Sequence, residues 1–338
     1  MTGTNSKPPV ALISPEAFID VRGPWVPILE KAGWAIRYPR EITFTQGHCG
    51  DEATVEELQG VSAIIAGGDR LTRRVVEALP DLRVIARAGV GYDRVDVPAA
   101  TDRGIPVTIT PTANHECVAE ATLALLFAVA KSIVDNDRRT RQGLWAGNST
   151  RPIRGNTIGL FGLGRIGKSM AVRCRALGMT VLATETYPDL GFVERNDVQL
   201  VSFDELLARS DYLSLHCPLN DQTRRMFNRS VFDRMKPGSV LLNTARGGLV
   251  HEADLYRALT EGPLSAAGLD VFEVEPVPAD NPLLTLSNVA LSPHLGGIDS
   301  LSLENMAIEA AQCIVRLYRN DWPSGAVVND ELRAGWKW

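Results

Sequence analysis

Short apolar runs alternate with longer mixed segments along the first hundred residues of the chain. The runs Val10–Ile13 and Ala63–Ala66, for example, each hold four apolar residues, and proline or glycine lies close to their ends. Continuous apolar runs of this length are typical of parallel strands that are covered on both faces. Further strands are expected at residues 34–36, 82–85 and 107–109, and helices at residues 25–32, 55–58 and 71–79. The pattern therefore predicts an α/β domain with a parallel sheet.

Two longer stretches predict the longest helices of the chain. One covers residues 112–131, with Asn114 as its N-cap, and the other covers residues 301–318. If the second helix packs on the first domain, the chain passes between two domains twice, and a ligand cleft is expected between them. The expected domains are a substrate domain of residues 1–110, completed by residues 301–338, and a dinucleotide-binding domain of residues 111–300.

A glycine-rich turn lies between an apolar run, Thr157–Phe161, and a helix expected at residues 166–179. Its first glycine permits a tight turn, its second lets the backbone approach a pyrophosphate, and its third lets the helix pack closely on the strand. The free N–H groups of the helix N-terminus would then face the phosphates. The motif residues are Gly162, Gly164, Arg165, Ile166 and Gly167.

An acidic residue follows the next apolar run at the spacing that dinucleotide binding requires. Glu185 stands 18 residues beyond the last glycine of the motif, directly after a strand expected at residues 180–183. A carboxylate at this place can accept hydrogen bonds from an adenosine ribose and would repel a 2′-phosphate. Asp189 adds a second negative charge nearby. The strand, turn, helix, strand and acid together predict dinucleotide binding, with NAD favoured over NADP.

Three later strands end in residues that could carry chemistry. Arg246 follows one of them and could hold a carboxylate with two parallel hydrogen bonds. Asp270 and Glu275 follow the second, and His294 follows the third. In an open α/β sheet the carboxyl ends of the strands face the ligand crevice. A carboxylate beside His294 would favour its protonated form, which suits a general acid for a carbonyl group and a base for the alcohol.

Composition and charge narrow the possible partners. The 338 residues are 45% hydrophobic, and the net charge of −5 gives no support for binding to nucleic acid or to an anionic membrane. The longest apolar stretch, residues 119–130, is too short to span a bilayer, and the N-terminus lacks the pattern of a secretory signal. Five scattered cysteines without metal-ligand spacing suggest free thiols, no metal and a cytoplasmic location.

Taken together, these segments resemble the D-isomer-specific 2-hydroxyacid dehydrogenase family over about residues 60 to 320. The resemblance rests on the segments GLGRIG, HCPLNDQT, MKPG, NTARGG, LDVFEVEP and SPHLGG. It implies two doubly wound parallel-sheet α/β domains, a flavodoxin-like substrate domain and a Rossmann NAD-binding domain, with a cleft between them. It also implies hydride transfer between a nicotinamide and C2 of a D-2-hydroxy acid or 2-oxo acid.

The resemblance also implies a role for individual residues. Arg246 would bind the substrate carboxylate and the reacting carbonyl oxygen, His294 would exchange the proton, and Glu275 would pair with His294. The backbone N–H groups of a loop in the first domain would hold the substrate carboxylate, and its residues are Gly89, Val90 and Gly91. The implied NAD-binding residues are Gly162, Gly164, Arg165, Ile166, Gly167, Glu185, Pro218, Thr223, Thr244, Ala245, Asp270 and Gly296. Among these, Asp270 would contact the nicotinamide carboxamide.

The identity of the substrate is open at this point. Phosphoglycerate dehydrogenases, which this chain resembles strongly around residues 87–95, tend to carry a phosphate-binding arginine in a loop that here reads Ala66-Gly67-Gly68-Asp69. The missing arginine and the added Asp69 carboxylate favour a small 2-oxo acid such as glyoxylate or hydroxypyruvate. The acid 3-phosphohydroxypyruvate stays open. The arginines that could substitute, each expected as a solvated surface charge, are Arg37, Arg70 and Arg151.

Other functions share this fold. Glu275 speaks against formate dehydrogenase, whose histidine is paired with glutamine, whereas phosphite oxidation stays open. Transcriptional corepressors that use NAD binding as a sensor also resemble the family, although this chain lacks their long disordered tails. The resemblance further suggests a homodimer made through the dinucleotide domains near residues 131–147, where Trp145 would suit an interface. Cys117 is expected to be a small buried residue.

Overall fold

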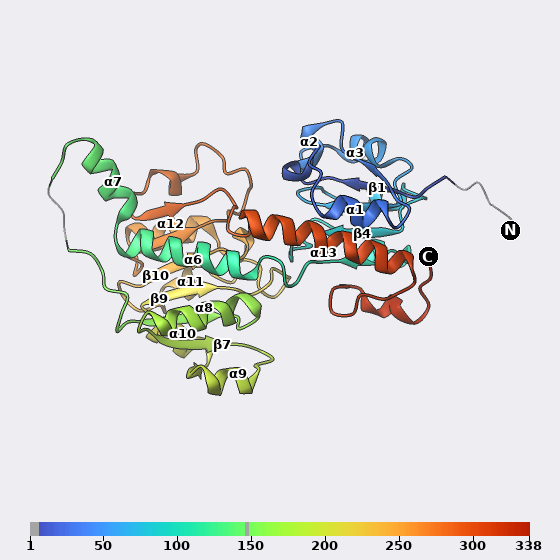
Figure 1. Ribbon diagram of the computed structural model, residues 1–338. Coiled ribbons are helices and arrows are strands. Elements are labelled where there is room, and N and C mark those ends of the chain that lie inside the picture. The colour runs from blue at the N-terminus through green and yellow to red at the C-terminus, as the bar shows by residue number, and fades with distance from the viewer. Residues whose placement is uncertain (1–6, 146–148) are drawn as a thin grey trace. The chain divides into compact units, whose positions relative to one another are not determined.

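The computed structural model describes residues 7–145 and 149–338, and it divides into two compact units (Figure 1). Unit 1 holds the chain as far as Asn114 together with Ile298–Trp338, and unit 2 is His115–Gly297. Each unit is built around its own parallel sheet. The structure thereby confirms the predicted fold class of two parallel-sheet α/β domains.

The sheet of unit 1 has five parallel strands in the order β2-β1-β3-β4-β5. This is the flavodoxin-like strand order, in which the order reverses between β1 and β3. The strands are β1 (Val10–Ile13), β2 (Ala35–Arg37), β3 (Ala63–Ala66), β4 (Val84–Arg87) and β5 (Val107–Thr108).

Helices cover both faces of this sheet, which explains its continuous apolar strands. On one face, Ala63 and Ile65 of β3 pack against α1 and α13, and on the other Ile64 and Ala66 pack against the helices between α2 and α5. The helices of unit 1 are α1 (Trp25–Glu30), α2 (Ile42–Thr45), α3 (Asp51–Leu58), α4 (Arg73–Glu77), α5 (Val97–Asp102) and α13 (Ser300–Tyr318), with short 3₁₀ turns at η1 (Glu16–Phe18) and η4 (Asp330–Ala334).

Aromatic residues hold the end of the chain on unit 1. The Trp338 ring packs edge-on against Trp34 and Tyr318, with ring centroids 5.3 Å and 5.0 Å away. The Trp336 indole N–H donates a hydrogen bond of 3.0 Å to the carbonyl oxygen of Gly104. Edge-to-face pairs of this kind stabilise beyond the area that they bury, so the last residues, although only partly buried, pack against the core of unit 1.

The sheet of unit 2 has seven parallel strands in the order β12-β11-β10-β9-β6-β7-β8. Counted from β6, this is the strand order of a Rossmann fold, and the order reverses between β6 and β9. The strands are β6 (Thr157–Phe161), β7 (Thr180–Thr184), β8 (Val198–Leu200), β9 (Tyr212–Leu215), β10 (Val240–Asn243), β11 (Ala266–Leu269) and β12 (Val289–Leu291). Ligands bind such sheets in the crevice beyond the carboxyl ends of the strands at the reversal.

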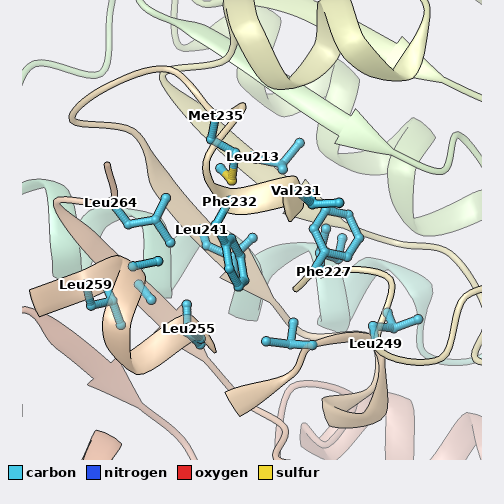
Figure 2. Close-up of a cluster of buried hydrophobic side chains, with 14 of the residues drawn as sticks. Leu213, Phe227, Val231, Phe232, Met235, Leu241, Leu249, Leu255, Leu259 and Leu264 are labelled. Carbon is cyan, nitrogen blue, oxygen red and sulfur yellow. The ribbon is translucent and has the colours of Figure 1, made fainter. Parts of the chain in front are cut away.

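Two hydrophobic clusters cover the two faces of the unit 2 sheet. The cluster in Figure 2 joins β9 and β10 to α11 and α12 through side chains such as Phe232, Leu241 and Leu255. The opposite face packs against α6 and α8. The helices of unit 2 are α6 (His115–Ala130), α7 (Ile133–Arg141), α8 (Arg165–Ala176), α9 (Leu190–Arg195), α10 (Phe203–Arg209), α11 (Arg229–Phe232) and α12 (Glu252–Thr260), with 3₁₀ turns at η2 (Gly247–Leu249) and η3 (Pro282–Thr285).

The helix expected over residues 112–131 differs from the one observed. It begins at His115, so Asn114 stands directly before the helix as expected, but its side-chain oxygen has no hydrogen-bond partner and does not cap the helix. Ser132, with φ of 49°, ends the helix, and α7 then leaves at an angle of 59° and projects away from the sheet of unit 2 (Figure 1). Among the described residues, no single helix is long and apolar enough to cross a membrane.

Candidate dinucleotide and active site

The glycine-rich turn is shaped by two close backbone approaches. Gly162 has a φ of 106°, which favours glycine, and a Cβ there would lie 2.8 Å from the His216 carbonyl carbon at the end of β9. A Cβ on Gly167 would clash with the carbonyl oxygen of Gly162, so this glycine lets α8 sit directly against the turn. Gly164 is different, because its Cβ would meet nothing within 4 Å. The space beside Gly164 is therefore left for a ligand or solvent.

The N-terminus of α8 presents donors at this open position. Gly164 is the residue before the helix, and Gly164 and Arg165 are exposed. The first N–H groups of a helix have no partner within it, and the helix dipole places partial positive charge there. This arrangement fits a pyrophosphate without any side-chain ligand, as the motif predicts.

Glu185 lies at the end of β7, beside the same turn. Its carboxylate accepts hydrogen bonds from the Leu163 N–H at 2.7 Å and from the Tyr187 N–H at 3.1 Å. Both bonds fix the carboxylate next to the glycine turn, where a ribose would be bound. Asp189 forms an ion pair of 2.7 Å with Lys168, so its negative charge is offset, and the predicted preference for NAD over NADP depends on Glu185.

The loop after β9 borders the same crevice from the other side of the strand-order reversal. The Thr223 hydroxyl donates to the Pro218 carbonyl oxygen at 2.8 Å and accepts from the Asn220 N–H at 2.9 Å. Thr223 thus holds this loop together, and its expected place in the lining of the cofactor site stays a prediction. His216, at the start of this loop, is buried beside Ser214, and burial lowers its pKa to about 4. It is therefore neutral at physiological pH.

Arg246 follows β10 in a turn that is fixed by hydrogen bonds and by close packing. Asn243 fixes the turn by accepting from the Ala245 N–H at 3.0 Å and donating to the Arg246 carbonyl oxygen at 2.9 Å. The next residue, Gly247, has no room for a Cβ because the backbone of Phe272 lies against it, and Leu249 enters the cluster of Figure 2. The half-buried guanidinium of Arg246 is therefore carried by a rigid turn.

Thr244 lies buried in the same turn, and the direction of its hydrogen bond can be assigned. The Thr122 hydroxyl donates to the Val118 carbonyl oxygen at 2.7 Å and also lies 2.7 Å from the Thr244 hydroxyl. Since Thr122 has one proton to give, Thr244 must be the donor of the second bond. The Thr244 oxygen thus keeps its lone pairs as acceptors, which suits a ligand N–H.

His294 and Glu275 meet as the sequence predicts. The His294 Nδ1 atom lies 2.7 Å from the Glu275 Oε2 atom, and the other carboxylate oxygen accepts from the Phe272 N–H at 3.0 Å. The imidazole is 45% exposed and the carboxylate 22%. The ring is therefore held through Nδ1, while its Nε2 atom is left to exchange a proton with a ligand.

Asp270 fixes the loop that carries His294. Its buried carboxylate accepts from the Leu295 N–H at 2.9 Å and the Gly296 N–H at 2.8 Å, and its carbonyl oxygen accepts from the His294 N–H at 2.8 Å. A Cβ on Gly296 would lie 2.6 Å from that carboxylate, which explains the glycine. Both carboxylate oxygens of Asp270 therefore accept hydrogen bonds from the loop, and contact of Asp270 with a nicotinamide stays a prediction. Cys117 is buried, as expected, and lies 3.3 Å from the Gly296 carbonyl oxygen.

Glu275 is supported by a pair of glutamates, Glu252 and Glu273, that the sequence analysis did not identify as functional. Glu252 accepts from the Glu273 N–H at 2.6 Å and from the Asn281 side-chain amide at 2.6 Å, and Glu273 accepts from the Glu252 N–H at 3.0 Å. This reciprocal pair ties the first residue of α12 to the segment that ends in Glu275. Because isolated acids are usually solvated, the sequence offered no signal for it.

The loop expected to bind the substrate carboxylate follows β4 in unit 1. Gly89 has a φ of 136° and exchanges two hydrogen bonds with Thr110, one through the Thr110 hydroxyl and one through its N–H. Arg87 holds the far side of the loop by donating to the Gly91 carbonyl oxygen at 3.0 Å. The N–H groups of Val90 and Gly91 have no hydrogen-bond partner among the described residues, so they can receive an anion.

The structure corrects two expectations about charge in unit 1. Asp69 does not add a carboxylate to the loop surface: it is fully buried, where it accepts from Ser14 and from the Gly67 N–H. Arg37 is not a solvated charge either, because its half-buried guanidinium donates to the carbonyl oxygens of Glu57 and Gln59.

The other two arginines that could hold a phosphate differ from each other. Arg70 is exposed, as expected. Arg151 is half-buried in unit 2, where it donates to Ser265 at 3.2 Å and lies over the Tyr212 ring. Within the described ranges, no group of three His, Cys, Asp or Glu residues could hold a metal ion.

Comparisons with known proteins agree with this geometry. Residues 123–296, just over half of the chain, match the family model described as "D-isomer specific 2-hydroxyacid dehydrogenase, NAD binding domain". A glyoxylate reductase from Korarchaeum cryptofilum is 40% identical over 82% of this chain and 86% of its own length. A D-3-phosphoglycerate dehydrogenase from Archaeoglobus fulgidus is 38% identical over 86% of this chain, which covers 56% of that protein.

A solved structure with bound ligands is also similar. The D-lactate dehydrogenase of Aquifex aeolicus, complexed with NAD and lactic acid, has a TM-score of 0.81 at 28% identity and covers 94% of this chain and 98% of its own. The chain spans little more than half the length of the phosphoglycerate dehydrogenases that it matches.

Proposed function

Because the chain belongs to the D-isomer-specific 2-hydroxyacid dehydrogenase family, we propose that it interconverts a small 2-oxo acid and the corresponding D-2-hydroxy acid with NAD as the cofactor. The observation that carries the proposal is the His294–Glu275 pair at 2.7 Å, carried at strand ends of a sheet with an intact dinucleotide turn. An acid–base pair beside a nicotinamide site is what reversible reduction of a carbonyl group requires.

His294 manages the proton in this proposal. Glu275 holds the Nδ1 side of the ring and stabilises its positive charge, so that Nε2 can give a proton to the carbonyl oxygen during reduction. In the reverse direction Nε2 takes the proton from the alcohol. Asp270 and the loop 294–296 keep the ring in place through three backbone hydrogen bonds.

Arg246 binds the substrate carboxylate and stabilises charge on the reacting oxygen. A planar guanidinium on a rigid turn is suited to both tasks, because its donors are oriented before the substrate arrives. The N–H groups of Val90 and Gly91 would bind the carboxylate as well. Placing these unit 1 donors with the unit 2 residues depends on the predicted cleft, which stays a prediction.

The residues of unit 2 fit the cofactor that the family model names. The N-terminus of α8 would hold the pyrophosphate, Glu185 the ribose, and Thr244 would accept from the carboxamide. When bound, the nicotinamide supplies or accepts the hydride at C2 of the substrate. The remaining expected contacts, which rest on the resemblance, are those of Pro218, Ala245 and Asp270.

Phosphoglycerate oxidation is the second candidate. It is favoured by the names of several relatives, and the exposed Arg70 could meet a phosphate. Arg37 cannot readily do so, since its guanidinium already serves two backbone carbonyl oxygens. Because Arg37 is occupied in this way, we favour a 2-oxo acid without a phosphate group as the substrate.

Oxidation of NADH by the purified protein tests the proposal. The acids to compare are glyoxylate, hydroxypyruvate, pyruvate and 3-phosphohydroxypyruvate, with NADPH run in parallel. We expect turnover of at least one acid with NADH, and a loss in kcat of about 10²- to 10⁴-fold in His294→Asn with NADH affinity retained. Tight NADH binding without turnover of any acid would instead favour an NAD-sensing protein.

We also propose that two copies associate through α7 and the segment after it. Ile133, Val134 and Leu144 are each more than half exposed, and Trp145 is 92% exposed, so it is not a core residue of its own unit. Large exposed apolar side chains close together mark interfaces. The expected stretch extends to Gly147, which lies outside the described residues.

A further inference from the structure

Arg225 joins three segments that follow neighbouring strands of unit 2. It lies in the loop after β9, and its backbone N–H donates a hydrogen bond of 2.8 Å to the carbonyl oxygen of Gly248, shortly beyond Arg246. Its guanidinium donates at 2.7 Å to the carboxylate of Glu273, shortly before Glu275. The segments after β9, β10 and β11 are therefore connected at one residue, and two of them carry the proposed catalytic groups.

The backbone of Arg225 adopts a conformation that residues with a side chain rarely take. Its φ is 49°, in the left-handed region that favours glycine. The chain then runs beside the turn that carries Arg246, where the Phe227 N–H donates to the Leu249 carbonyl oxygen at 3.0 Å (Figure 2 shows both side chains). A glycine would fit this backbone without strain, so the arginine side chain indicates a task of its own.

The guanidinium of Arg225 compensates two carboxylates that are tied to each other. Glu252 and Glu273 accept hydrogen bonds from each other's backbone N–H, at 2.6 Å and 3.0 Å respectively. Among the described residues, Arg225 is the only cation that forms an ion pair with either glutamate. The Glu273 carboxylate is 18% exposed, so water screens the repulsion between the two like charges only in part. Removal of the guanidinium would therefore push the glutamates apart and move the segment that leads to Glu275.

We propose that Arg225 is a positioning residue for the proton-transfer pair: through Glu273 it holds the segment that carries Glu275, and thereby keeps His294 in place. This inference rests on the proposed function. The effect is expected in kcat rather than in stability. An ion pair whose arginine is 61% exposed adds little to stability, whereas a small displacement of a proton-transfer group slows the reaction.

Arg225→Gly deletes the guanidinium and keeps a backbone that suits the observed φ. The kcat for the acid that is reduced fastest, the dissociation constant for NADH and the melting temperature would be measured on the full chain. We expect kcat to fall about tenfold while the other two values stay nearly unchanged. Arg225→Lys, which keeps the charge, should restore most of the activity.

The neighbouring arginine provides a matched control. Arg224 is exposed, and its side chain has no hydrogen-bond or ion-pair partner among the described residues. Arg224→Ala removes one positive charge from the same loop, as Arg225→Gly does, and should keep the kcat of the wild type.

Added guanidinium ions test whether the missing group acts where the structure places it. A cleft of about 560 Å³ is lined by Arg225, Glu252 and Glu273 among others, so a small ion can reach the ion-pair site from solvent. Millimolar guanidinium chloride should raise the kcat of Arg225→Gly several-fold, and sodium chloride at the same concentration should not. Neither salt should raise the kcat of the wild type.

Glu273→Gln tests the route by which Arg225 acts. The double variant with Arg225→Gly should be no slower than Arg225→Gly alone, because the amide removes the repulsion that the arginine offsets. A kcat of Arg225→Gly within about twofold of the wild type, or losses that add in the double variant, would overturn this inference alone. A fall in kcat matched by a fall in melting temperature, and not rescued by guanidinium, would show a structural role and would also overturn it. If the wild type reduces none of the acids, the proposed function fails and the inference fails with it.

Discussion

Single residues in this protein derive their roles from hydrogen bonds that orient them. His294 is oriented by Glu275, and Glu275 in turn by the Phe272 N–H and by the Glu252–Glu273 pair behind it. A proton-transfer residue works when its ring is held before the substrate arrives. Much of this support is backbone contact, which no motif in the sequence describes.

Glu275→Gln tests the charge in this arrangement. The amide oxygen can still accept from Nδ1, so the ring keeps its position, but the negative charge that stabilises the imidazolium is lost. We expect kcat to fall by about tenfold or more with the NADH dissociation constant unchanged. Steady-state kinetics and NADH titration give the two values, and an unchanged kcat would show that Glu275 has no part in proton transfer.

Asp69 also predicts a pH dependence of stability. Its pKa is raised from 3.8 to about 6 in the folded chain, so its stabilising effect is present below pH 3.8 and is lost as the pH rises through 6. The loss amounts to about 3 kcal/mol of unfolding free energy for unit 1. About 1.4 kcal/mol of this loss falls between pH 5 and pH 7.5, and Asp69→Asn should remove that share of the difference in stability between the two pH values.

Tryptophan fluorescence during urea unfolding can measure this effect. Five of the six tryptophans lie in unit 1, and the sixth is Trp145 in unit 2, so the signal reports mainly on unit 1. Equal pH dependence in the wild type and Asp69→Asn would contradict the assignment of a raised pKa to this group.

At the scale of elements, the first and third glycines of the turn have a packing role, and the second has open space. A Cβ on Gly167 would clash with the Gly162 carbonyl oxygen, while a Cβ on Gly164 would meet nothing within 4 Å. Gly167→Ala should therefore destabilise the protein by about 1–3 kcal/mol. Gly164→Ala should leave the melting temperature unchanged but weaken NADH binding. Thermal unfolding without cofactor and NADH titration test both, and the reverse pattern would refute these roles.

Much of the element order follows from the sequence, and the reasons are physical. Strands such as Val10–Ile13 and Thr157–Phe161 were predicted with their observed bounds, because both faces are buried and their apolar runs are continuous. The strand β8 has an exposed end and no such run, and it was not predicted. The end of α6 was predicted to within one residue, but the helix α7 that follows it was missed, because α7 buries none of its residues and has no apolar periodicity that would mark a helix.

Residues of the candidate site could be predicted where a chemically suitable residue type stands at the end of a predicted strand. Arg246, Glu275 and His294 stand at strand ends, so the topology of a parallel sheet explains their common edge. The burial of Asp69 was not predictable, because its hydrogen-bond partner Ser14 is 55 residues away in the sequence. Long-range contacts of polar residues leave no periodic pattern.

At the scale of the whole molecule, the proposed dimer depends on α7 and the apolar residues around it. Val134→Glu together with Trp145→Glu would place charge in an apolar contact and should shift the protein from dimer to monomer. Sedimentation equilibrium gives the mass directly. Val172→Glu, which changes another exposed apolar residue of unit 2, serves as the control and should leave the mass unchanged. A wild-type monomer at micromolar concentration would contradict the proposal.

The most direct test of the central claim follows the hydride itself. The protein would be incubated with NADH that carries deuterium at both hydrogens of C4 of the nicotinamide and with the 2-oxo acid that it reduces fastest among those whose product has a stereocentre at C2, such as hydroxypyruvate or pyruvate. The product would be analysed by mass spectrometry and chiral chromatography. We predict a D-2-hydroxy acid with deuterium at C2, formed by the wild type and nearly absent with His294→Asn. An unlabelled product, an L-configured product or equal yields from both proteins would contradict the account.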